Sequence, residues 1–169
     1  MTSQNDLIKI FEFALNQERT GKNFFEASIK RMGVGAAVSA FERLIQEEDK
    51  HIAFIQSILD DLQNERDIEL PKAVTLEQET ENFFDDRAKS EFLEQCLNES
   101  MVPDVTVFNT AWLIEKDLSD YYARMAEKTE GTAARALEML SKWESRHEKF
   151  FKEFRDTLSR TYAEMPWGG

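Results

Sequence analysis

The stretch FERLIQEEDKHIAFIQSIL, residues 41–59, decides the fold, because its apolar residues recur at steps of three and four. The stretch LEMLSKWESRHEKFFKEF, residues 137–154, has the same spacing. Such spacing is typical of the side of a helix that faces its neighbours in a bundle. In both stretches that side is interrupted by a glutamate and, three residues later, a histidine. These pairs are Glu48 with His51 and Glu144 with His147, and the chain has only these two histidines.

Two further stretches show the same spacing and carry one glutamate each at mid-length. The first consists of Ile8, Phe11, Leu15, Glu18, Lys22, Phe25 and Ile29, and the second of Phe108, Ala111, Glu115, Leu118, Tyr122 and Met125. Lys22 interrupts the first stretch, so it must snorkel or turn outward. The order of a single glutamate followed by an E-x-x-H pair therefore occurs twice along the chain.

This repeated order predicts a dinuclear metal site inside a four-helix bundle. An E-x-x-H step places both side chains on one helical face, about one turn apart. Four glutamates buried near one another would be driven to protonate by desolvation and mutual repulsion. Two divalent cations would balance them, with neutral imidazoles completing the ligand set. The candidate ligands are Glu18, Glu48, His51, Glu115, Glu144 and His147. The alternative is that these residues form ordinary core hydrogen bonds or lie on a solvated face.

The paired E-x-x-H motifs resemble the ferritin-like superfamily, and within it the rubrerythrin-type di-iron proteins. The resemblance implies that Glu18 and Glu115 are terminal ligands, that Glu48 and Glu144 bridge, and that each metal has one imidazole. The chain departs from the family pattern in three ways. Its only cysteine is Cys96, so the four-cysteine rubredoxin iron site is missing. Leu118 stands where rubrerythrins carry an extra glutamate, and no fifth helix of ferritin type is evident after Leu158. The first two departures argue against a self-contained peroxidase and the third against a storage cage.

The predicted fold is all-α: a ferritin-like four-helix bundle that forms a single domain over residues 1–169. We expect helices over about 5–31, 36–65, 103–128 and 132–161, with Thr132 as the N-cap of the last. The first and second helices form one antiparallel hairpin, and the third and fourth form another. A long crossover, containing a short helix over about 82–98, would join them.

Composition restricts the partners. The net charge of −12 and the pI near 4.7 disfavour nucleic acid, because binding phosphates needs a basic face. No apolar run approaches the roughly 20 residues that span a bilayer. The N-terminus lacks the pattern of a secretory signal, which predicts a cytoplasmic protein. The 13 phenylalanines on long helices favour a homodimer.

The donor set favours redox chemistry. Oxygen-rich ligands with one imidazole per metal suit two Fe ions, with Mn or Zn possible. The leading hypothesis is an oxidoreductase that reduces hydrogen peroxide or dioxygen, with electrons from a separate donor protein such as a rubredoxin. Peroxide reduction ranks before ferroxidase activity. A di-iron monooxygenase and a manganese catalase remain open, as does a non-catalytic iron chaperone or structural zinc or iron bundle.

Three aromatic residues lie close to the candidate ligands in the sequence. Tyr122 is seven residues after Glu115 on the same face, so it could donate a hydrogen bond to a ligand carboxylate. The alternative is a core tyrosine whose hydroxyl bonds elsewhere. Trp112 and Trp143 are interpreted as core packing.

Overall fold

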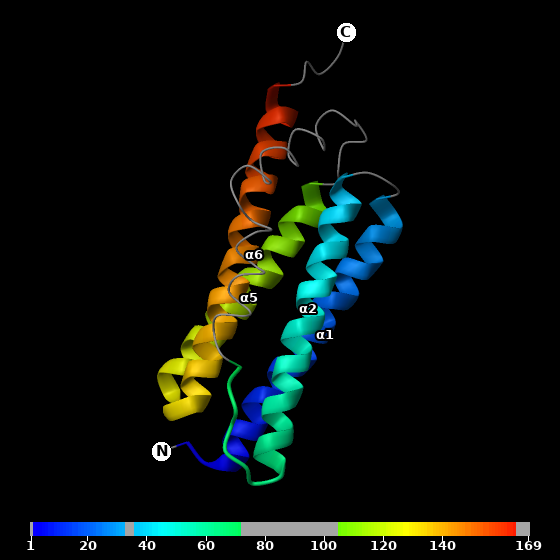
Figure 1. The fold of residues 1–169 in the computed structure, drawn as a ribbon. Coiled ribbons are helices and arrows are strands. Elements are labelled where there is room, and N and C mark those ends of the chain that lie inside the picture. Colours follow the sequence, from blue (N-terminus) through cyan, green and yellow to red (C-terminus); the bar gives the residue numbers. More distant parts are fainter. Residues whose placement is uncertain (1, 33–35, 72–104, 165–169) are drawn as a thin grey trace.

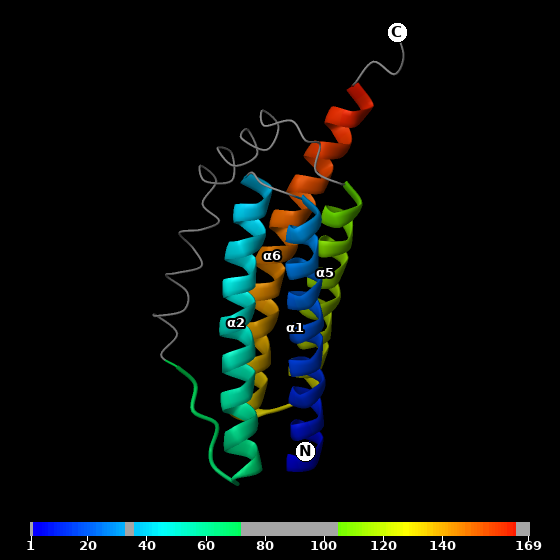
Figure 2. The same cartoon turned by 90° about the vertical axis from the view of Figure 1, so that its right-hand side faces the viewer.

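Four long helices form a bundle in the part of the chain that the structure, a computed structural model, describes: residues 2–32, 36–71 and 105–164 (Figures 1 and 2). They are α1 (Gln4–Met32), α2 (Ala36–Gln63), α5 (Val105–Lys128) and α6 (Gly131–Glu164). The last turns of α6 extend beyond the other three helices (Figure 2). The prediction of an all-α, ferritin-like bundle is confirmed, whereas the helix predicted over 82–98 lies outside the described residues.

The helices pair as two antiparallel hairpins, α1 with α2 and α5 with α6 (Figure 1). The C-terminal end of α2 and the N-terminal end of α5 lie at opposite ends of the bundle, so these two helices run parallel. The chain between them must therefore travel the length of the bundle. This confirms the predicted long crossover, which is the connection that distinguishes ferritin-like bundles from simple up-and-down ones.

Two helix ends differ from the sequence prediction. Helix α2 stops at Gln63 because Glu65 has a left-handed backbone, with φ of 55°, and the amide of Arg66 donates back to the carbonyl of Asp61 at 2.8 Å. Helix α6 is already formed at Gly131, whose φ is 65°. The prediction of Thr132 as an N-cap is therefore wrong, since Thr132 lies inside the first turn.

The interior consists of two apolar clusters with a polar layer between them. One cluster is rich in phenylalanine and includes Phe25, Phe41, Phe108 and Phe151. The other includes Phe11, Ile55, Ile58, Leu118 and Leu137. Along each helix the candidate ligands fall between residues of the first cluster and residues of the second. Because apolar side chains close both ends of the polar layer, water is excluded there and charges interact strongly.

The interior side of α1 is rotated slightly from the predicted one. The buried positions on either side of Glu18 are Ala14 and Gly21, whereas the predicted stretch had Leu15 and Lys22 there, with Lys22 expected to snorkel or turn outward. Lys22 turns outward and forms ion pairs with Asp49 and Glu26. Alanine and glycine add little to a hydrophobic pattern, yet their small size lets a neighbouring helix approach closely.

Candidate metal centre

Six side chains from four helices meet in the polar layer. Glu18 comes from α1, Glu115 from α5, and the two E-x-x-H pairs from α2 and α6. None is more than 2% exposed. The structure therefore brings together all six residues that the sequence singled out. Such burial is unusual, because glutamate is almost never fully buried unless it has a partner for its charge.

Glu48 and Glu144 each lie between the two imidazoles. The Nδ1 atom of His51 is 2.6 Å from Glu144 Oε1 and 3.8 Å from Glu48 Oε2. The Nδ1 atom of His147 is 3.3 Å from Glu48 Oε1 and 3.4 Å from Glu144 Oε2. Each of these two carboxylates thus directs one oxygen toward each histidine.

Glu18 and Glu115 differ from this pair, because each has a contact with one imidazole. Glu18 Oε2 lies 3.8 Å from Nδ1 of His51, and Glu115 Oε2 lies 3.4 Å from Nδ1 of His147. The polar layer therefore divides into two halves, each with its own imidazole and its own carboxylate. Glu48 and Glu144 are common to both halves.

The carboxylate oxygens fit a pair of cations. The four glutamates carry eight such oxygens, and seven of them are buried and accept no hydrogen bond of regular geometry within the described residues. Two ligand atoms that are each about 2.1 Å from one ion, at right angles, are about 3 Å apart. The observed separations of 2.6–3.8 Å between imidazole nitrogens and carboxylate oxygens are in that range. The chemistry and the spacing of the donors thus fit two divalent metal ions.

A protein-family model described as Rubrerythrin matches residues 9–155, which include most of both hairpins and all six residues of the polar layer. The chain belongs to the rubrerythrin family. No curated protein and no solved structure matched it. The family match and the geometric group of Glu48, His51, Glu144 and His147 together support a dinuclear metal site. None of the described helices has the length and apolar character needed to cross a membrane.

Without metal, this rubrerythrin-family centre holds protons. Burial raises the pKa of Glu18 and of Glu115 well above the usual value, and the charges of Glu144 and Glu48 raise both further. Burial acts to lower the pKa of His51, but the neighbouring Glu144 and Glu18 more than offset it and raise that pKa well above its usual value. Cations would take the place of these protons.

The pKa values of Glu144 and His147 are also shifted in the polar layer. Burial acts to raise the pKa of the Glu144 carboxyl, yet its close contact with His51 dominates and holds that pKa well below the usual value. For His147 burial acts to lower the pKa, and the adjacent Glu115 outweighs it, so the pKa is raised well above normal. An ionised Glu144 beside Glu18 and Glu115 carboxyls that hold protons is an arrangement that reduces the repulsion between like charges in a metal-free layer.

Two aromatic side chains hold the ligand candidates in place. The Tyr122 hydroxyl donates a hydrogen bond to Glu18 Oε1. The sequence had left open whether this hydroxyl reaches a candidate ligand or bonds elsewhere; its acceptor lies on the opposite hairpin. The Trp143 ring stacks on the His51 ring, with centroids 5.1 Å apart and planes 12° apart, and meets Phe54 edge-on. Sequence reasoning had placed Trp143 in the core but had not identified its contact with a candidate ligand.

Proposed function

We propose that the polar layer binds two iron ions and that the chain is an oxidoreductase that reduces hydrogen peroxide. The observation that carries this proposal is the placement of Glu48 and Glu144, each with one oxygen toward either imidazole. In this proposal both carboxylates would be shared by the two ions. Glu18 with His51 would hold one ion, and Glu115 with His147 would hold the other. Carboxylates with one imidazole per ion suit iron or manganese, and zinc competes through its affinity.

The reaction is the two-electron reduction of hydrogen peroxide, which with two protons gives two molecules of water. Two iron ions, when bound, would supply one electron each, so that no radical needs to escape. The chain itself excludes bulk water through its two apolar clusters. The Tyr122 hydroxyl keeps its proton directed at Glu18 Oε1, and Trp143 fixes the plane of His51. Outer contacts of this kind orient ligands and tune a metal site.

The electrons would come from a separate protein such as a rubredoxin. A rubredoxin-type iron site needs four cysteines, and the 169 residues contain one. We also propose that the protein is a homodimer, since long helices rich in phenylalanine often pair. Light scattering tests this directly, and the mass of a single chain in solution would contradict it.

The function is tested by loading the chain with two Fe²⁺ per molecule without oxygen and mixing it with H₂O₂ or O₂ in a stopped-flow instrument. The expected result is much faster oxidation by H₂O₂. Faster oxidation by O₂ would instead favour a ferroxidase or a di-iron monooxygenase, and O₂ release from peroxide without any donor would indicate a catalase. A chain that takes up Zn²⁺ but no Fe²⁺ would favour a non-catalytic structural bundle.

A further inference from the structure

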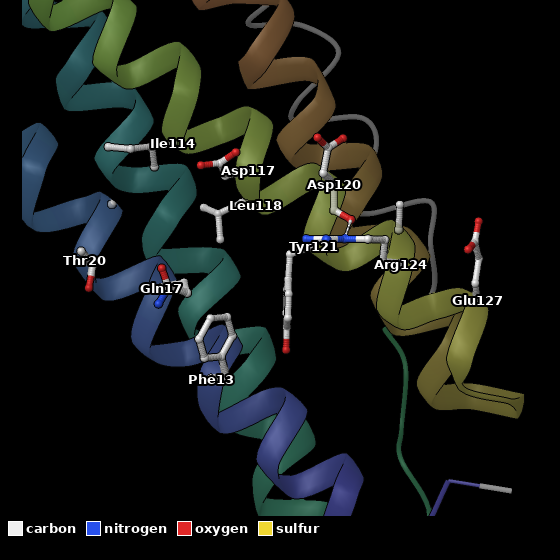
Figure 3. A pocket seen from close by; sticks show the side chains of 12 residues that line it. Phe13, Gln17, Thr20, Ile114, Asp117, Leu118, Asp120, Tyr121, Arg124 and Glu127 are labelled. Carbon is white, nitrogen blue, oxygen red and sulfur yellow. Dashed lines mark hydrogen bonds between the residues drawn. The ribbon is translucent and has the colours of Figure 1, made fainter.

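A groove of about 800 Å³ lies between α1 and α5, the two helices that carry the single glutamates (Figure 3). Phe13 and Gln17 line it from α1, and Ile114, Leu118 and Tyr121 line it from α5. Figure 3 shows the Phe13 and Tyr121 rings next to each other at one end, where their centroids are 4.9 Å apart. The floor of the groove thus carries apolar side chains from both helices, with Gln17 and Thr20 of α1 beside them.

Two residues that line the groove lie close to the polar layer along their helices. Gly21 lines the groove and follows Glu18 by three residues, and Leu118 lines it and follows Glu115 by three. Three residues of helix advance about 4.5 Å along its axis, so each residue lies one turn from its glutamate. Gly21 and Leu118 occupy equivalent positions in the two hairpins. One of the pair has no side chain, which leaves Leu118 as the main cover on this side.

The opposite side of the polar layer is closed by larger groups. There Trp143 of α6 stacks on His51 of α2, and its ring also meets Phe54 at 5.2 Å. The two apolar clusters close the ends of the layer along the bundle axis. Compared with the Trp143 side and the two ends, the groove side thus has the smallest covering groups among the described residues.

We propose that a small neutral oxidant reaches the metal centre through this floor, between Gly21 and Leu118, and that Leu118 limits the size of what passes. The identity of the oxidant rests on the proposed function. The groove itself does not limit the size of the molecule, because one of the size of water or peroxide occupies only about 30 Å³. Its rim carries Asp117, Asp120 and Glu127 against Arg124. This negative rim disfavours anions and admits uncharged hydrogen peroxide.

The test compares two leucines of equal burial. Leu118 and Leu59 are each 5% exposed and belong to the same apolar cluster, but Leu59 lies on α2 and does not line the groove. Nitric oxide, a small neutral probe, is mixed with the Fe²⁺-loaded chain, and its binding rate is followed by absorbance. Leu118→Ala should raise this rate about tenfold, the effect of one modest barrier. Leu59→Ala should leave it unchanged although it removes the same side chain.

Gly21→Ala tests the same route in the opposite direction. An added Cβ at Gly21 would lie 3.4 Å from Cγ2 of Ile114, so the methyl group fits but fills the gap. Alanine also favours the helix, so thermal stability should be kept or increased. Nitric oxide binding should nevertheless slow by roughly threefold, again the effect of one small barrier. Slower binding in a variant of equal or higher stability would mean that the substitution restricts access and does not loosen the fold.

Measuring the iron content first separates the proposed function from the proposed route. A wild-type chain that binds no iron would contradict the proposed function and, with it, the route. An iron-loaded chain whose nitric oxide rates are the same in Leu118→Ala and Gly21→Ala as in the wild type would overturn the route alone. So would a Leu59→Ala variant that accelerates binding as much as Leu118→Ala does.

Discussion

Replacing Glu48 by glutamine should remove a ligand from both halves of the metal centre at once. One Glu48 oxygen lies 3.3 Å from His147 Nδ1 and the other 3.8 Å from His51 Nδ1. Glutamine keeps the shape but is neutral and has a single oxygen. Loss of an outer contact alone typically weakens metal binding 10–100-fold. Loss of a bridging ligand should exceed that, so the iron content should fall from about two ions per chain to below one.

The same substitution should stabilise the metal-free protein. Both Glu48 oxygens are buried without a hydrogen bond. Such a group costs about 1–3 kcal/mol, and more when it is charged. Neutralising it should raise the free energy of unfolding by a similar amount, and each kcal/mol corresponds to about 2–4 °C in Tm for a chain of this size. Free metal at 100 times its Kd, in contrast, would stabilise the wild type by about 2.7 kcal/mol. Glu48→Gln should therefore be more stable than the wild type in chelator and less stable than the wild type in iron.

Urea unfolding followed by circular dichroism, in EDTA and in anaerobic Fe²⁺, measures both effects, with elemental analysis for metal content. Glu42→Gln is the matched control, because Glu42 is an exposed glutamate on the same helix. It should change neither quantity. A Glu48→Gln chain that still binds two iron ions, with an unchanged urea midpoint in EDTA, would refute the shared-ligand assignment.

Three further outcomes are expected. Tyr122→Phe removes the hydrogen bond to Glu18, so metal affinity should fall about 10–100-fold in a competition titration while the fold is kept. Phe151→Ala empties a fully buried site between other phenylalanine rings and should lower the free energy of unfolding by about 3–5 kcal/mol in urea. The metal-free protein should lose stability as the pH rises from about 5 to 8 in a series of Tm measurements. The raised pKa values of Glu18, Glu115 and His51 mean that the folded state binds protons more tightly than the unfolded state above the usual pKa values of those groups. Metal should reverse this trend, because its binding releases those protons.

Much of the centre could be predicted from the sequence because its residues interrupt a strong periodic signal. Glu48 and His51 stand among Leu44, Ile55 and other apolar residues at steps of three and four, so helix geometry alone sets their direction. The prediction was less accurate on α1: Lys22 turns outward as one of its two options had it, but the sequence did not identify Gly21 as the buried position. Glycine and lysine both have low hydrophobicity, so a hydrophobic pattern cannot tell which of the two is buried. Only the close approach of a neighbouring helix makes that difference.

Contacts between the hairpins could be predicted only in part: the sequence suggested that Tyr122 could reach a candidate ligand, but not which one. The partner of Tyr122 is Glu18, 104 residues away, and Trp143 rests on His51 of another helix. Both depend on the rotation of one hairpin against the other, which no local spacing encodes. The end of α2 was missed for a different reason, because Glu65 adopts a left-handed backbone that is uncommon for residues other than glycine.

The metal centre also links metal binding to the docking of the two hairpins. Nδ1 of His51 lies 2.6 Å from Glu144, and Nδ1 of His147 lies 3.3 Å from Glu48. Each imidazole thus contacts a carboxylate of the opposite hairpin, and neither hairpin alone offers a complete ligand set. The apolar clusters can dock the hairpins without metal, but they then bring four carboxylates together. Cations relieve this repulsion, so metal binding and docking of the hairpins must favour each other.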